Sequence, residues 1–289
     1  MSQTMLTIAL PLALAWVMYC VGLTLTVNDF KRVALYPRKI TAALAAQLIG
    51  LPLLAYLLIQ LFSLPEPIAA GLWLLAIAPG DASSNAISHL SGGDSALSIT
   101  ITAVSSLIIP FSLPLMLPLI IDSSSFVMPV KTAVLQLAAV TIMPLGIAMT
   151  MRRYITASWF AGFRSFAESS ALWALFFTVV VTLAANSKIF NQLFTIASTA
   201  AVLLCLSGML LGLTVAKLLG GDKRLIKTLS IEVGIQNAGT AIFAAVVLLQ
   251  KPELALTPLL YGILMNIPAM LLIYRNKRRT ALLKDFSQE

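Results

Sequence analysis

The sequence predicts an all-α polytopic membrane protein of about nine transmembrane helices, and three observations lead to this fold class. Hydrophobic residues make up 59% of the chain and charged residues only 10%, whereas about a quarter of the residues of a soluble globular protein are charged. The mean hydropathy is +0.95. The apolar residues also fall into runs of about 20, the length that a helix needs to cross a bilayer.

The apolar runs place the nine expected spans at residues 5–27, 40–62, 68–90, 95–121, 129–151, 167–185, 192–219, 226–249 and 254–274. The connections are too short for an extra soluble domain, so residues 1–289 are expected to form a single membrane domain. The first 30 residues contain no Lys or Arg. The first run therefore lacks the basic head of a signal peptide and is expected to remain as a span.

The basic residues occur in short clusters between the apolar runs. A net charge of +8 could indicate nucleic-acid binding, but this clustering is the pattern that orients spans in a membrane, so no nucleic-acid partner is expected. With the N-terminus outside and the C-terminus in the cytoplasm, all but three of the 19 Lys and Arg residues face the cytoplasm. The three exceptions are Lys131, Lys188 and Lys251.

The eighth span contains a carboxylate, Glu232, which is followed by Gly234, Gln236, Asn237 and Gly239. A carboxylate in mid-membrane costs about 3 kcal/mol on insertion scales, so it should face a partner or a wet cavity. The glycines weaken the helix here. Backbone carbonyls freed by a break are tolerated at this depth only where they line a cavity or bind an ion. We therefore expect a broken helix.

The third span contains a second interruption, where Pro79-Gly80 is followed by Asp81 and by Ser83, Ser84 and Asn85. Interrupted spans in the two halves of a chain, each with polar groups at mid-depth, indicate a secondary transporter built from inverted repeats. No convincing repeat of residue identity supports this layout.

Further oxygen-bearing side chains follow in the fourth span, where Ser98 and Thr102 lie on one face of a helix. Alone, such residues usually bond back to a carbonyl or help helices to pack. Together with Ser84, Asn85 and Glu232 they form an all-oxygen set with one negative charge, which suits a hard cation better than a transition metal. Outside this set, His89 is expected at the membrane interface, and Cys20 and Cys205 as buried hydrophobic residues.

Three segments carry a resemblance to a known family: residues 78–85, residues 93–102 and the run Glu232-Val233-Gly234-Ile235-Gln236-Asn237. Together with an early Gly22-Leu-Thr-Leu and Asp29-Phe30, they resemble the signatures of the bile acid:sodium symporter (BASS/SBF) family over nearly the whole chain. We interpret the chain as a bacterial member, expected in the inner membrane.

The resemblance implies two broken helices that cross in a core (about 40–121 and 192–274), packed against a panel (about 5–27 and 129–185). It also implies two sodium ions. The first would be bound by Ser84, Asn85, Ser98, Thr102 and Glu232. The second would be bound by Gln47, Glu232 and Gln236 with the carbonyls of Val233 and Ile235. The substrate would lie near Asp81, Ala82, Asn85, Asn237 and Asn266.

The chain departs from the family pattern in two ways. The resemblance implies that bacterial members often have ten spans, and this chain is expected to lack the first, so the panel should be one helix smaller. Asp81 stands where the pattern usually has a second glycine. It would repel an organic anion unless protonated or paired, or else it caps the half-helix that begins at Ala82. Both roles are open.

The expected function is sodium-coupled symport of a small organic, anionic or amphipathic solute by alternating access. The alternatives are a proton-coupled or ion-independent transporter of the same fold, an intramembrane hydrolase using Asp81 and Glu232, and a receptor that transports nothing. The sequence favours a transporter, and not an enzyme, because the two acids lie among amides and hydroxyls suited to binding ions.

Overall fold

The computed structural model describes residues 3–78, 80, 82–120, 129–167, 170 and 195–285, and all regular structure in these residues is helical. The first half contains α1 (Gln3–Thr24), α2 (Val27–Leu35), α3 (Pro37–Ala45), η1 (Ala46–Gly50), α4 (Leu51–Phe62), α5 (Glu66–Ala76), α6 (Ala82–Leu90) and α7 (Ser95–Ile120). After α8 (Val130–Tyr154) and a helical segment at 158–167, the second half contains α10 (Ile196–Leu218), α11 (Lys223–Gly234), α12 (Ala238–Phe243), η4 (Ala244–Leu248), η5 (Pro252–Ala255), α13 (Leu256–Leu264) and α14 (Asn266–Asp285).

The helices coincide with the expected spans wherever the structure describes them. In the described residues, six helices are long and apolar enough to cross a membrane, or seven if the bent pair α1 and α2 counts as one span. The expected span at 167–185 lies almost entirely outside the described residues. The chain is thus a multi-pass helical membrane protein.

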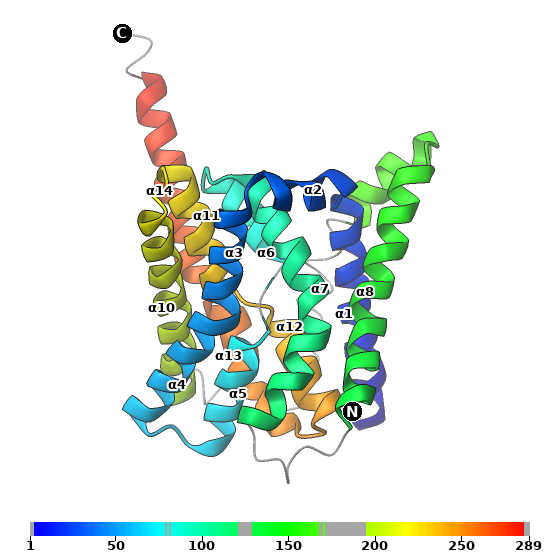
Figure 1. The fold of residues 1–289 in the computed structure, drawn as a ribbon, viewed down its shortest axis with the longest axis vertical. Coiled ribbons are helices and arrows are strands. Elements are labelled where there is room, and N and C mark those ends of the chain that lie inside the picture. The colour runs from blue at the N-terminus through cyan, green and yellow to red at the C-terminus, as the bar shows by residue number, and fades with distance from the viewer. Residues whose placement is uncertain are drawn as a thin grey trace.

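The stretch 28–39, between the first two expected spans, is mostly helical and belongs to α2 and α3. Helix α2 is bent by 71° from α1 and runs along one end of the molecule (Figure 1). Asp29 stabilises its start by accepting the backbone N–H of Thr26 at 2.7 Å.

The segments differ sharply in how much of their apolar length is buried. The buried share of the apolar stretch is 83% for Lys223–Leu248, which carries Glu232, and only 22% for α8. The helix with the charged residue therefore lies inside the helix bundle, while α8 exposes most of its surface to the surroundings. Helix α8 packs along α1 on one side of the molecule, and α10 packs along α11 on the other (Figure 1).

Candidate functional site

Two helix breaks meet inside the bundle. Helix α5 ends at Ala76 and α6 begins at Ala82, while α11 ends at Gly234 and α12 begins at Ala238. Asn237 joins the breaks, since its backbone N–H donates to the carbonyl of Ala78 at 3.0 Å and its Nδ2 to that of Gly80 at 3.3 Å. Its Oδ1 also accepts the N–H of Thr240 at 2.9 Å and so caps α12.

Gly80 permits this close approach for two reasons. Its φ of +83° lies in the left-handed region, which side chains disfavour. A Cβ atom on it would also stand 2.3 Å from Oγ of Ser105. The Pro-Gly signal in the sequence thus corresponds to a backbone conformation that only glycine accepts at this position.

Three carbonyls at the α11 break receive side-chain donors. Nε2 of Gln47 donates to the carbonyl of Glu232 at 2.7 Å, and Nε2 of Gln236 donates to that of Val233 at 2.6 Å. The hydroxyl of Tyr261 donates to the carbonyl of Gly234 at 2.5 Å. The break is therefore stabilised from three different segments, as buried carbonyls in a membrane require.

The carboxylate of Glu232 is fully buried and lies among hydroxyl groups. Its Oε1 accepts from Ser84 Oγ at 2.8 Å and from Ser98 Oγ, and its Oε2 accepts from Thr102 Oγ1 at 3.1 Å. Asn85 Oδ1 lies 2.9 Å from Ser98 Oγ and 3.2 Å from Thr102 Oγ1. The structure thus brings together all five residues expected at the first sodium site.

The chemistry of this cluster fits a cation. Each of the three hydroxyls carries one proton, yet their oxygens make five contacts with carboxylate or amide oxygens. At most three of these contacts are hydrogen bonds to these acceptors. A sodium ion among the oxygens would offset the repulsion in the remaining contacts and the charge of Glu232.

The residues of the second expected site also lie together. Gln47 lies on the π-helical turn η1, and its Oε1 and that of Gln236 are buried acceptors with no hydrogen-bond partner. Leaving a buried acceptor unsatisfied costs about 1–3 kcal/mol. Val233 and Ile235, which precede Gln236 in the chain, are also fully buried. Two buried amide oxygens without hydrogen-bond partners, next to a helix break, are oxygen ligands that suit a hard cation.

The expected substrate residues are more dispersed. Asp81 lies outside the described residues, and Ala82 begins α6. Asn85 belongs to the hydroxyl cluster and Asn237 to the junction of the breaks. Asn266 is exposed, and its Nδ2 donates to the carbonyls of Gly262 and Ile263 in its own segment of chain.

Sequence reasoning missed two residues that support the site. Tyr261 is fully buried, and its hydroxyl is one of the few polar groups in an apolar segment, which could have marked it. Thr228, one turn before Glu232, accepts the backbone N–H of Asp94 at 2.7 Å and so fixes the start of α7 against α11. No local pattern marks Thr228.

Known proteins resemble this chain over most of its length. A model of the Sodium Bile acid symporter family matches residues 11–193, more than half of the chain. The chain is 29% identical over 223 residues to the uncharacterized sodium-dependent transporter YocS of Bacillus subtilis, which covers 77% of this chain and 69% of that protein. It is 27% identical over 245 residues to the probable sodium/metabolite cotransporter BASS1, chloroplastic, of Oryza sativa. This match covers 80% of this chain and 57% of that protein.

A third relative is the sodium/bile acid cotransporter 4 of Mus musculus, which is 30% identical over 284 residues (91% of this chain and 62% of that protein). The chain thus spans between about half and two thirds of the length of these curated relatives. The family and the relatives are transporters and not enzymes.

Proposed function

Because the chain belongs to the sodium bile acid symporter family, we propose that it is a sodium-coupled symporter of a small organic, anionic or amphipathic solute. The observation that carries this proposal is the buried carboxylate of Glu232, surrounded by the oxygens of Ser84, Asn85, Ser98 and Thr102. A buried charge in a membrane protein needs a partner, and a sodium ion is a partner that these neutral oxygens can help to bind.

Two sodium ions bind, one at each of the two oxygen sets. The first set is the Glu232 cluster with Ser84, Asn85, Ser98 and Thr102. The second comprises Gln47, Gln236 and Glu232 with the carbonyls of Val233 and Ile235. The unpaired amide oxygens of Gln47 and Gln236 support this second site. The solute binds where the two breaks meet, near Asp81, Ala82, Asn85 and Asn237, with Asn266 reached in another conformation of the transporter.

Sodium couples to the solute through the junction of the breaks. When sodium offsets the charge of Glu232, it fixes α6 against α11, and Asn237 then fixes the two breaks where the solute binds. The solute must in turn tighten sodium binding by the same factor, because coupling between two sites is reciprocal. Alternating access moves the core (40–121 and 192–274) against the panel (5–27 and 129–185). Core and panel together form nine spans and contain inverted repeats.

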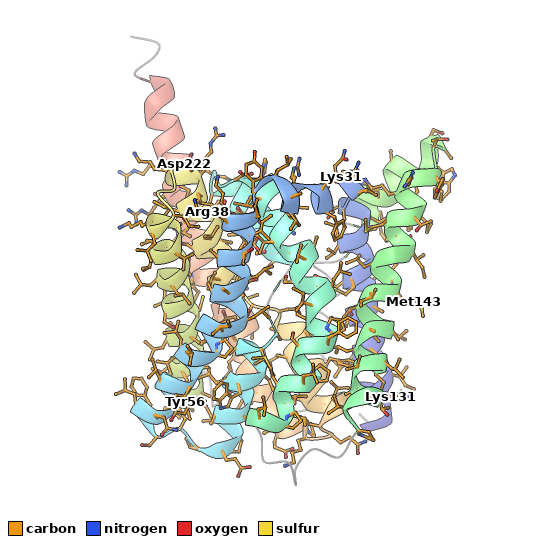
Figure 2. The ribbon with its side chains drawn as sticks, viewed as in Figure 1. Lys31, Arg38, Tyr56, Lys131, Met143 and Asp222 are labelled. Carbon is orange, nitrogen blue, oxygen red and sulfur yellow. The ribbon has the colours of Figure 1, made fainter. Side chains whose placement is uncertain are left out.

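The protein is oriented in a bacterial inner membrane with its N-terminus outside. The charge distribution supports this orientation, since Lys31 and Arg38 lie at one end of the molecule and Lys131 at the other (Figure 2). Helix α14 projects from the end (Figure 1) at which Lys31 and Arg38 are labelled in Figure 2. Basic residues concentrate on the cytoplasmic side of membrane proteins, so that end faces the cytoplasm.

The test measures sodium binding directly and does not require the solute. Purified protein is titrated with NaCl against choline chloride at constant ionic strength, and the midpoint of thermal unfolding is recorded. Wild type should be stabilised by sodium, whereas Glu232→Gln should lose more than about 100-fold in sodium affinity, since it removes one partner of a buried charge pair. Glu253→Gln, at an exposed glutamate in η5, is the matched control and should behave as wild type.

Uptake in proteoliposomes completes the test. A screen of small organic anions and amphipaths, each with and without a sodium gradient, should yield a solute whose uptake needs sodium in wild type and Glu253→Gln. Glu232→Gln and Glu232→Ala should insert into the membrane and lack that uptake. Undiminished sodium stabilisation in Glu232→Gln would refute the assignment of the ion site.

A further inference from the structure

A row of hydroxyl groups, the hydroxyl seam, continues from the first sodium site along the contact between α6 and α11. At its start Ser84 donates to Glu232 at 2.8 Å. One turn further along both helices, Ser88 Oγ lies 3.5 Å from Thr228 Oγ1, at the outer limit of a hydrogen bond. Both residues are fully buried. The seam is narrow here, because a Cβ atom on Gly93 would stand 2.6 Å from Ser88 Oγ and 2.8 Å from Thr228 Oγ1.

Ser91 extends the seam by a further turn. Helix α6 ends at Leu90, but the backbone N–H of Ser91 still donates to the carbonyl of Ile87 at 2.9 Å, so Ser91 follows the helical path. The spacing of residues 84, 88 and 91 places the three serines on one face of that path. Ser91 is buried, and its Oγ has no hydrogen-bond partner. A buried hydroxyl without a partner is costly, so it calls for a role in another state of the protein.

The far end of the seam is closed by Lys227. Its Nζ donates to the carbonyl of Ser91 at 2.6 Å and to Oδ1 of Asn276, in α14, at 2.8 Å. Nδ2 of Asn276 donates in turn to the carbonyl of Leu90 at 3.1 Å. These three bonds tie α11, α14 and the end of α6 together, and the seam is shut as long as they hold.

The closed end lies on the side of the molecule that we assign to the cytoplasm. Asp222 caps the start of α11, and it is labelled at the same end of the molecule as Lys31 and Arg38 (Figure 2). From that end α11 runs inward to its break at Gly234. The hydroxyl seam therefore joins the Glu232 cluster to the proposed cytoplasmic surface.

We propose that sodium passes between the first sodium site and the cytoplasm along this seam, with Ser88, Thr228 and Ser91 as passing ligands and Lys227 as the gate. The inference rests on the proposed sodium coupling and orientation. Hydroxyl and carbonyl oxygens can replace part of the hydration shell of a hard cation. Because sodium at Glu232 fixes α6 against α11, loss of sodium loosens the two helices and opens the seam between them.

Cysteine accessibility from each side of the membrane tests the route. Ser91→Cys and Ser88→Cys are made with Cys20 and Cys205 replaced by alanine. A cationic methanethiosulfonate that cannot cross the membrane is then added to vesicles of either orientation. In choline chloride both variants should react from the cytoplasmic face only, Ser91→Cys faster than Ser88→Cys. Thr141→Cys, at a buried hydroxyl in α8, is the matched control and should not react.

Sodium chloride should slow the reaction of both seam variants at least about fivefold, the lower end of typical coupling between two sites. Ser91→Cys is the main variant, because the Oγ that it replaces has no hydrogen bond to lose. It keeps the route testable if Ser88→Cys fails to fold. Reaction of Ser91→Cys from the outer face, or at the rate of Thr141→Cys, would overturn the proposal.

A second arm tests the gate. Lys227→Met, added to Ser91→Cys, removes the donor that holds the Ser91 carbonyl and Asn276, so the reaction should become about tenfold faster. Lys223→Met, at an exposed lysine in the first turn of α11, is the matched control and should leave the rate unchanged. Equal rates for the two lysine variants would exclude Lys227 as the gate.

Sodium titration of wild-type thermal unfolding separates failure of the route from failure of sodium coupling. If sodium stabilises the wild type but slows the reaction of neither seam variant, the route is wrong and the sodium site stands. If sodium does not stabilise the wild type, the proposed function fails and the route fails with it.

Discussion

The backbone N–H of Asn237 donates to the carbonyl of Ala78 at 3.0 Å, and this bond joins the two helix breaks of the protein. The same residue caps α12 through its Oδ1 and contacts Gly80 through its Nδ2. One side chain thus satisfies backbone groups on both broken segments. Because no water is available in the bilayer core to replace these bonds, the junction depends on this residue.

Asn237→Ala should therefore destabilise the protein by about 1–2 kcal/mol, through loss of the cap and of the bond to Gly80. Asn237→Ser should lose less, since its hydroxyl oxygen can still accept from Thr240. Thermal unfolding in detergent measures both. Asn266→Ala is the control, because that asparagine is exposed, and its unfolding should match wild type. An Asn237→Ala protein as stable as wild type would show that the junction does not need the side chain.

Sodium should stabilise the wild-type protein through the unpaired Oε1 atoms of Gln47 and Gln236. Gln47→Met removes one acceptor at similar volume. In choline its unfolding midpoint should stay near that of wild type, since the loss of the bond to the Glu232 carbonyl is offset by removal of an unsatisfied oxygen. In sodium the stabilisation should be smaller, and calorimetric titration should show one ion bound instead of two. Two ions bound with unchanged affinity would exclude Gln47 as a ligand.

Tyr261→Phe should destabilise the protein by about 1–3 kcal/mol, because the carbonyl of Gly234 would lose its donor in a fully buried position. Tyr274→Phe is the matched control at a tyrosine that is 62% exposed, and it should have no effect. Thermal unfolding compares the two variants. Sodium titration of Tyr261→Phe should also show weaker binding, since the freed carbonyl lies two residues from Glu232. Equal unfolding midpoints for the two variants would contradict this role.

Gly212→Ala tests the contact between α10 and α11. A Cβ atom at Gly212 would lie 2.1 Å from the carbonyl oxygen of Leu229, so the helices would have to separate, at a cost of about 1–3 kcal/mol or more. Gly146→Ala, in α8, meets no atom within 4 Å and should stabilise slightly through better helix propensity. Opposite shifts of the unfolding midpoint are expected for these two substitutions, and shifts of the same sign would contradict the packing.

Local properties of the chain were sufficient for much of the fold. The apolar runs predicted the helices at the described spans. Pro79-Gly80 and the residues 234–237 marked the two breaks. Both signals could be found in the sequence because hydropathy and helix breaking depend on neighbouring residues. The bend between α1 and α2 was not predicted. It lies between Thr24 and Val27, before the polar residues of α2, and α2 packs on α7, a contact between segments far apart in the chain.

The candidate site divides in the same way. The sequence by itself determined which residues bring oxygen to mid-membrane, since buried Glu232, Gln47 and the Ser and Thr residues stand out in apolar runs. Only the tertiary structure decided that Gln47 holds the carbonyl of Glu232, that Tyr261 holds that of Gly234, and that Asn266 is exposed. These contacts join segments far apart in the chain, and the packing of whole helices, rather than any local pattern, sets which side chains meet.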